Sequence, residues 1–125
     1  MKEIEKTIKD YFNSWKTKDE TVLEKTFSQD AVYIESWGPA YRNKKQILAW
    51  FREWNKENTV LEWSIKAFYH TGSESICEWY FKCKCGGVID GFNGVSIVTF
   101  DEDNKIVQLK EFQSKTPNTY PYDIV

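Results

Sequence analysis

The first third of the chain carries apolar residues at helical spacing. Between Ile4 and Trp15 they recur every three or four positions, which predicts one apolar face of a helix ending near residues 16–18. Asp19 is of the residue type that caps a helix start, so we expect a short second helix after it. The apolar side of that second helix is formed by Val22, Leu23 and Phe27.

A strand and a third helix follow. Residues 31–37 have strand character, and Gly38-Pro39 ends them. The third helix is predicted over residues 43–56, with Asn43 as its cap. Its apolar stripe consists of Ile47, Trp50, Phe51 and Trp54.

From residue 60 onward the apolar period changes from helical spacing to two, which predicts antiparallel strands joined by tight turns. The predicted turns are residues 71–73, 86–87 and 101–104, and the last two strands cover residues 88–100 and 105–113. We expect a bulge or bend inside the strand over 88–100, at Gly91 and Gly94. The tail after residue 117 is predicted to be a loop, anchored by Tyr120, Tyr122 and Ile124.

Helices followed by a run of antiparallel strands indicate an α+β fold, and 125 residues fit one domain, residues 1–125, with one core. The rings are numerous, with six Trp, seven Tyr and eight Phe, so they can fill a core or line a ligand cavity.

Charge and hydropathy exclude several classes of protein. The net charge is −2, and Lys and Glu are interleaved rather than segregated into a basic face, so we expect no nucleic-acid partner. No stretch approaches the roughly 18 apolar residues of a membrane span, and the polar N-terminus does not resemble a signal peptide. We therefore expect a cytoplasmic protein without a membrane partner.

The cysteines and the lone histidine give little material for a metal site. The odd count of three Cys favours reduced thiols, and Cys77, Cys83 and Cys85 share one strand face, where buried apolar thiols are the simplest interpretation. Zinc usually takes a different ligand spacing, and His70 is the only His. We expect neither a metal nor a cofactor.

Four local segments stand out by their order and spacing: the helix ending in Trp15 before Asp19, and residues 27–33, 38–51 and 98–107. Together they resemble the NTF2-like superfamily, which includes SnoaL-like and ketosteroid isomerase-like proteins. The resemblance implies a cone-shaped (cystatin-like) fold, with three N-terminal helices packed into a strongly bent, mostly antiparallel sheet. Residues 90–96 and 110–115 resemble uncharacterised bacterial members.

The same resemblance implies candidate catalytic residues. It places Glu35 where ketosteroid isomerases carry their catalytic carboxylate, Tyr11 at their oxyanion-donating tyrosine, and Ser96 at their second, protonated acid. A carboxylate in an apolar cone has a raised pKa, which suits a general base, and a tyrosine hydroxyl can stabilise an enolate. The alternatives are that Glu35 is a rim acid paired with Arg42 or a Lys, and that Tyr11 is a core ring.

Strand parity extends the candidate pocket. Asp90 and Glu111 are predicted to face inward with Glu35, and three acids among aromatic rings favour a cationic or amine ligand. The alternatives are a solvated turn for Asp90 and a Lys partner for Glu111. The remaining predicted pocket residues are Trp15, Tyr33, Trp37, Trp50, Trp54, Trp63, Trp79 and Gln113.

Three functions stay open. The first is binding of a small molecule in the cone with cofactor-independent proton transfer, as in an isomerase, cyclase or dehydratase, with Glu35 as base. The second is a non-catalytic ligand binder, and the third is an interaction module whose cone is filled by side chains. We also expect a homodimer through the outer sheet face, which carries Ile76, Tyr80, Val95 and Ile97.

Overall fold

The computed structural model describes residues 2–123. Its helices are α1 (Lys2–Thr17), α2 (Glu20–Thr26) and α3 (Lys44–Glu57). Its strands are β1 (Phe27–Ile34), β2 (Ala40–Tyr41), β3 (Asn58–Thr71), β4 (Glu74–Cys85), β5 (Val88–Phe100) and β6 (Ile106–Lys115).

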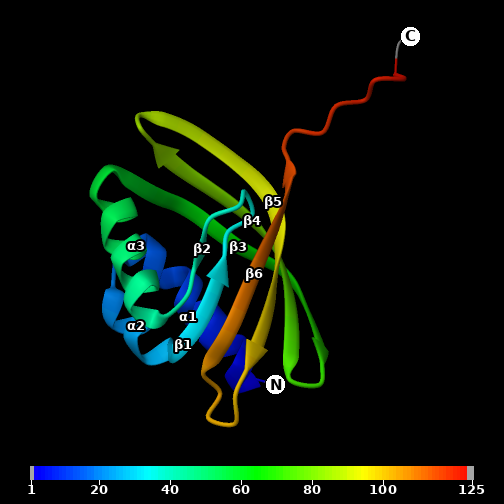
Figure 1. Ribbon diagram of the computed structural model, residues 1–125. Helices are drawn as coiled ribbons and strands as arrows, with labels where there is room; N and C mark the ends of the chain where they lie inside the picture. The colour runs from blue at the N-terminus through cyan, green and yellow to red at the C-terminus, as the bar shows by residue number, and fades with distance from the viewer. Residues whose placement is uncertain (1, 124–125) are drawn as a thin grey trace.

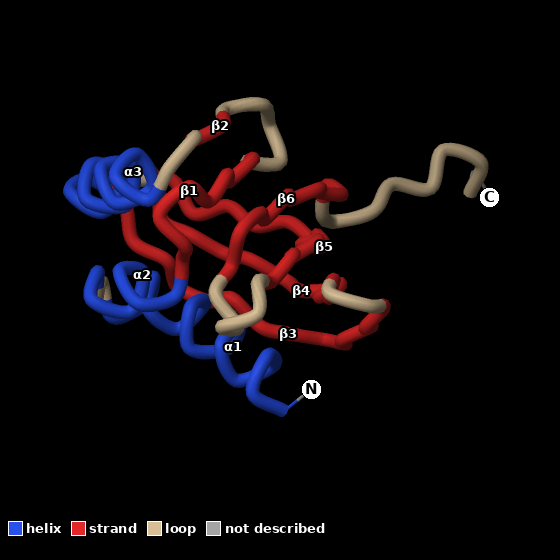
Figure 2. Tube along the Cα trace, turned by 60° about the horizontal axis from the view of Figure 1, so that its bottom comes forward, coloured by secondary structure: helices blue, strands red, loops and turns tan. Residues whose placement is uncertain are grey.

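The strands form one curved sheet in the order β2-β1-β6-β5-β4-β3. All neighbours pair antiparallel except β1 and β6, which run parallel. The three helices gather on one side of the sheet, which bends around them (Figures 1 and 2). The predicted fold class, three helices packed against a strongly bent and mostly antiparallel sheet, is confirmed.

The helix starts follow the predicted caps. The Asp19 carboxylate accepts a hydrogen bond from the backbone N–H of Thr21 at 3.1 Å, and the Asn43 side chain accepts one from Gln46 at 2.9 Å. Each bond satisfies an amide that the first helical turn leaves without a partner. Both helices therefore begin where the sequence predicts.

The boundaries of β1 differ from the prediction. Phe27 is the first residue of β1 rather than part of the second helix, and the strand ends at Ile34 rather than at residue 37. Gly38, with φ of +124°, and Pro39 turn the chain back, so that the short strand β2 pairs with the end of β1. Residues 35–39 form this loop, closed by a 2.9 Å hydrogen bond from the Glu35 N–H to the Pro39 carbonyl.

The bulge predicted at Gly91 and Gly94 is absent. The β4–β5 pairing runs without a register shift from Glu74↔Thr99 to Cys85↔Val88. Gly94 lies opposite Trp79, and a Cβ there would collide with the indole ring and with the Phe112 carbonyl. Glycine at this position makes room for a large ring on the neighbouring strand.

Two irregularities do occur in β3, between Val60 and Glu62 and between Ile65 and Ala67. Each shifts the alternation of faces by one residue. Val60 and Trp63 are consequently buried together, whereas Tyr69 is 58% exposed.

The tail does not dock on the domain. Tyr120 and Tyr122 are 70% and 94% exposed, and Figure 1 shows the chain leading away from the sheet after β6. The predicted anchoring by these two residues is therefore wrong, and Ile124 lies outside the described residues.

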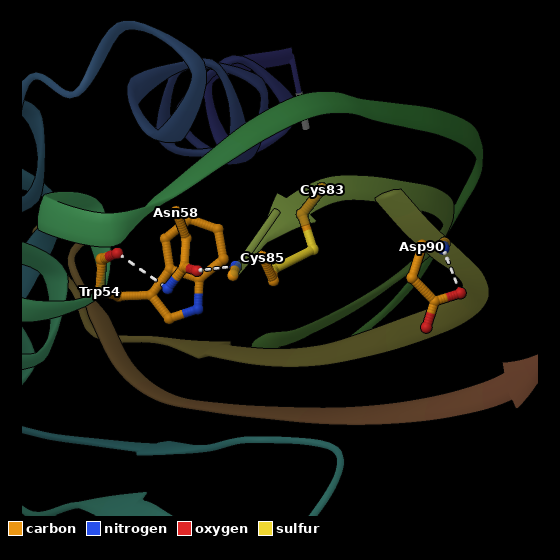
Figure 3. Close-up of a disulfide and its surroundings, with 7 residues drawn as sticks. Trp54, Asn58, Cys83, Cys85 and Asp90 are labelled. Carbon is orange, nitrogen blue, oxygen red and sulfur yellow. Dashed lines mark hydrogen bonds between the residues drawn. A yellow bond between two sulfur atoms is a disulfide. The ribbon is translucent and has the colours of Figure 1, made fainter. Parts of the chain in front are cut away.

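The prediction of three reduced thiols is also wrong. Cys83 and Cys85 are joined by a disulfide (Figure 3). Cys77 is free and buried. Alternate residues of one strand point to the same face, and the Cα atoms of this pair are 5.9 Å apart, within the usual range for a disulfide. Among the described residues, no helix has both the length and the apolar character required to cross a membrane.

Candidate functional site

A cavity of about 190 Å³ opens between the helices and the concave face of the sheet. The helices contribute Trp15, Trp50 and Trp54, and the loop after β1 contributes Glu35, Ser36 and Trp37. The remaining lining comes from the sheet: Tyr33, Trp63, Phe81, Cys83, Cys85, Phe92, Glu111 and Gln113.

Most of the predicted pocket residues meet here. The predicted residues that line the cavity are Trp15, Tyr33, Glu35, Trp37, Trp50, Trp54, Trp63, Glu111 and Gln113. The sequence interpretation missed Ser36, Phe81, Cys83, Cys85 and Phe92. Parity was the available signal for the strand residues, because Phe81 and the two cysteines alternate on one face and Phe92 lies opposite Phe81 in the β4–β5 ladder.

Four predicted residues do not line the cavity. Tyr11 is fully buried. Trp79 and Ser96 are also buried, and Trp79 donates a 2.9 Å hydrogen bond from Nε1 to the Ser96 hydroxyl. This pair belongs to the core, because large rings on the same faces fill the deeper part of the cone. Asp90 is exposed, and its carboxylate accepts a hydrogen bond from its neighbour's backbone at the β4–β5 hairpin (Figure 3).

Two buried tyrosines lead to one of the cavity's carboxylates. The Tyr11 hydroxyl donates to the Tyr33 hydroxyl at 2.8 Å, and Tyr33 in turn donates to Oε2 of Glu111. Burial and the nearby charge of Glu111 raise the pKa of both tyrosines well above 10.0. Both hydroxyls therefore keep their protons and act as donors in this chain.

Glu111 is the most perturbed acid of the site. Burial raises the pKa of its carboxyl from an ordinary 4.5 to about 8. The hydrogen bond from Tyr33 lowers this pKa, and the charge of Glu35 adds a smaller upward effect. Glu111 is consequently neutral at pH 7, and can donate a hydrogen bond into the cavity.

Glu35 has a different environment at the mouth of the same cavity. Oε2 accepts a 2.7 Å hydrogen bond from the Tyr41 hydroxyl, and the Tyr41 ring stacks on Trp50 with centroids 4.6 Å apart. Burial raises the pKa of Glu35, while hydrogen bonds from Tyr41 and Trp37 oppose the rise. The pKa of Glu35 is therefore less perturbed than that of Glu111.

Neither acid has a basic partner in the part of the chain that the structure describes. Within residues 2–123 the ion pairs join other groups, so Glu35 is not paired with Arg42 or a Lys, and Glu111 is not paired with a Lys. Neutral hydrogen-bond donors alone therefore hold Glu35 and Glu111, and no ion pair compensates the negative charge of Glu35.

Aromatic rings form both walls of the cavity. On the helical side Trp15 contacts Trp50 and Trp54, with ring centroids 4.8 and 5.4 Å away. On the sheet side Phe81 contacts both Trp63 and Phe92, at 5.3 Å each. These tilted and edge-to-face contacts fix the rings against one another, so the cavity is bounded by rigid apolar surfaces.

The model of the SnoaL-like domain matches residues 8–109. The chain belongs to this family. Solved structures with related folds include an LEH-like epoxide hydrolase from Mycobacterium tuberculosis, at 14% identity and a TM-score of 0.81, covering 90% of this chain and 84% of that one. No curated protein matches the chain.

Two further SnoaL-like or ketosteroid isomerase-like structures have the same fold. A Catenulispora acidiphila protein in complex with trimethylamine shares 14% identity and a TM-score of 0.77, covering 88% of this chain and 85% of that one. A Mesorhizobium loti protein described as a SnoaL-like polyketide cyclase shares 20% identity and a TM-score of 0.69, covering 87% and 97%. At these identities the likeness shows the fold alone, and the chemistry must be argued from the side chains of this chain.

Proposed function

We propose that this SnoaL-like protein binds a small organic molecule in the cavity and transfers a proton on it without a cofactor. The observation that carries the proposal is that two carboxyl groups of unlike environment face one aromatic cavity. Two acids whose environments push their pKa values apart can serve as a base and an acid at the same pH.

The roles follow from the two environments. Glu35, the less perturbed acid, is the general base that removes a proton from a carbon next to a carbonyl group. Glu111 is neutral at pH 7 and donates a hydrogen bond to the carbonyl oxygen as negative charge develops there. Return of the proton from Glu35 to a different carbon of the enolate gives an isomer, so atoms and charges balance without any further reagent.

The proposal reassigns the role that the resemblance gave to Tyr11. Tyr11 lies behind Tyr33 and has no access to the cavity, so it cannot donate directly to a bound oxygen. Glu111 takes over the donor role, and the two tyrosines become positioning residues for it. Ser96 has no part in the site, because it is fully buried in the core, where its hydroxyl accepts a hydrogen bond from Trp79, and it does not line the cavity.

Proton transfer can be tested without knowing the natural substrate. A panel of enolisable ketones, steroid and aromatic polyketide-like ones included, would be incubated in D₂O and followed by NMR for protein-dependent exchange of C–H for C–D. We expect Glu35→Gln to reduce exchange by at least about 100-fold, in line with the loss of a general base. The exposed Glu53, whose side chain is 78% exposed, gives the matched control Glu53→Gln.

Full exchange activity in Glu35→Gln would contradict the mechanism. Absence of exchange with the whole panel, combined with a ligand that raises the melting temperature, would favour the second candidate, a binder that does not turn over its ligand. The Catenulispora acidiphila protein with bound trimethylamine supports small-molecule binding, which both candidates share. The open cavity argues against a cone filled by side chains.

A further inference from the structure

We propose that the ligand of the cavity carries an alkylated ammonium group, which sits between the aromatic walls and is attracted by the Glu35 carboxylate. This inference rests on the proposed function only in placing the ligand in this cavity. It adds the chemical class of the ligand.

The charge of the lining is one-sided. The fourteen lining residues include two Glu and no Lys, Arg or His. Every basic group that forms an ion pair within residues 2–123 does so away from the cavity, with Glu5, Asp10, Glu20, Glu24 or Glu53. The partly buried Glu35 carboxylate has no counter-charge among these residues, so a cationic ligand would supply the partner that the protein does not.

The aromatic lining narrows the class of cation. Eight of the fourteen lining residues are aromatic, and they come from both the helices and the sheet. The faces of such rings attract cations, Trp most strongly. A cation placed between the walls would therefore be attracted from both sides.

The aromatic walls favour an alkylated over a primary ammonium. A primary ammonium buried in the cavity would need acceptors for three N–H groups. One oxygen of Glu35 is engaged by Tyr41 and one of Glu111 by Tyr33, and the other polar lining side chains are Ser36 and Gln113. An alkylated ammonium needs few hydrogen bonds or none and presents methyl groups to the rings, so it fits this lining better.

The cation is compatible with proton transfer. A positive charge near Glu35 favours its ionised form, which is the form required of a base. An ammonium group on the substrate also withdraws electrons from a neighbouring C–H and makes that proton easier to remove.

The test is a pair of ligands that differ in charge but not in shape. Choline and 3,3-dimethylbutan-1-ol have the same skeleton, with nitrogen replaced by carbon in the alcohol. Binding would be measured by isothermal titration calorimetry and by the fluorescence of the cavity tryptophans, at constant ionic strength because salt screens charge. We expect choline to bind at least about tenfold more tightly than the alcohol.

Variants locate the effect in the cavity. The double change Glu35→Gln and Glu111→Gln should weaken choline at least about tenfold and leave the alcohol unchanged, whereas Glu53→Gln should change neither. Circular dichroism would check that each variant is folded. Equal affinity for choline and the alcohol, no binding of choline at millimolar concentration, or choline binding that the double change leaves intact would each overturn the proposal.

The outcomes separate this inference from the proposed function. Exchange of neutral ketones without choline binding would refute the ligand class and leave proton transfer standing. Charge-selective choline binding that depends on Glu35 and Glu111, with no exchange on any ketone, would support the ligand class and refute the catalytic role.

Discussion

Glu111 should make the stability of the protein fall as pH rises, and Glu111→Gln should remove that fall. In the unfolded chain this carboxyl ionises near its ordinary pKa of 4.5, whereas in the folded protein burial raises the pKa to about 8. Between these values unfolding releases a proton, because the folded state binds one that the unfolded state does not. The free energy of unfolding therefore falls with pH across this window and levels off above about pH 8.

The magnitude follows from the two pKa values. Each pH unit between 4.5 and about 8 contributes 1.36 kcal/mol, so the full effect has an upper limit of about 5 kcal/mol. Glu111 is only partly buried, and its side chain lines a cavity that is open to water. Water in the cavity screens the charge, so we expect a net effect of roughly 1–3 kcal/mol.

Glu111→Gln is the matched perturbation. A glutamine carbonyl can still accept the hydrogen bond from Tyr33, but it carries no charge at any pH. Urea denaturation at pH 5 and at pH 8.5 would give the free energy of unfolding of both proteins. We expect similar stability at pH 5 and a variant that is more stable by roughly 1–3 kcal/mol at pH 8.5.

The difference between the two proteins cancels the titration of all other groups, and Glu53→Gln would show what an exposed acid contributes. Parallel curves for the wild type and Glu111→Gln over this range would refute the claim that Glu111 is held neutral. They would also remove its role as a hydrogen-bond donor at pH 7.

Three other predictions concern the frame around the site. Gly94→Ala should cost about 1–3 kcal/mol in urea denaturation, because the added Cβ collides with Trp79 and with a backbone carbonyl. His70→Ala should cost about 1–3 kcal/mol by the same assay, because the buried Ser75 hydroxyl loses a partner 2.7 Å away, while choline affinity stays unchanged. We predict a homodimer through the outer sheet face, so light scattering of the wild type at micromolar concentration should give twice the monomer mass. Val95→Lys should reduce the measured mass to that of a monomer. A monomeric wild type would contradict the predicted dimer.

The sequence predicted those parts of the fold that depend on local signals. Helix starts were placed at Asp19 and Asn43 because a cap is decided by a side chain and the amides two or three residues away. The end of β1 could not be placed in this way, because it depends on the pairing with β2 that follows Gly38. The role of Gly94 was also beyond local reasoning, since the ring that requires it lies on another strand.

The sequence predicted which strand face lines the candidate site, but not how deep in the cone each residue lies. Parity correctly placed Tyr33 and Glu111 toward the interior of the cone. It could not show that Tyr11 lies behind Tyr33, or that Asp90, although in phase with Phe92, lies at the exposed end of the hairpin. Depth along the cone is set by the packing of the helices against the sheet, which no single strand's pattern contains.

The direction of the buried hydrogen bonds gives Tyr11 a positioning role, although it does not line the cavity. Tyr11 donates to Tyr33, which leaves the Tyr33 proton free to be donated onward to Oε2 of Glu111. With Oε2 occupied as an acceptor, the proton of the neutral carboxyl is left to Oε1, the atom free to face a ligand. The two tyrosines therefore orient the donor of the site, and a phenylalanine at Tyr11 would loosen that orientation without removing any group that contacts the ligand.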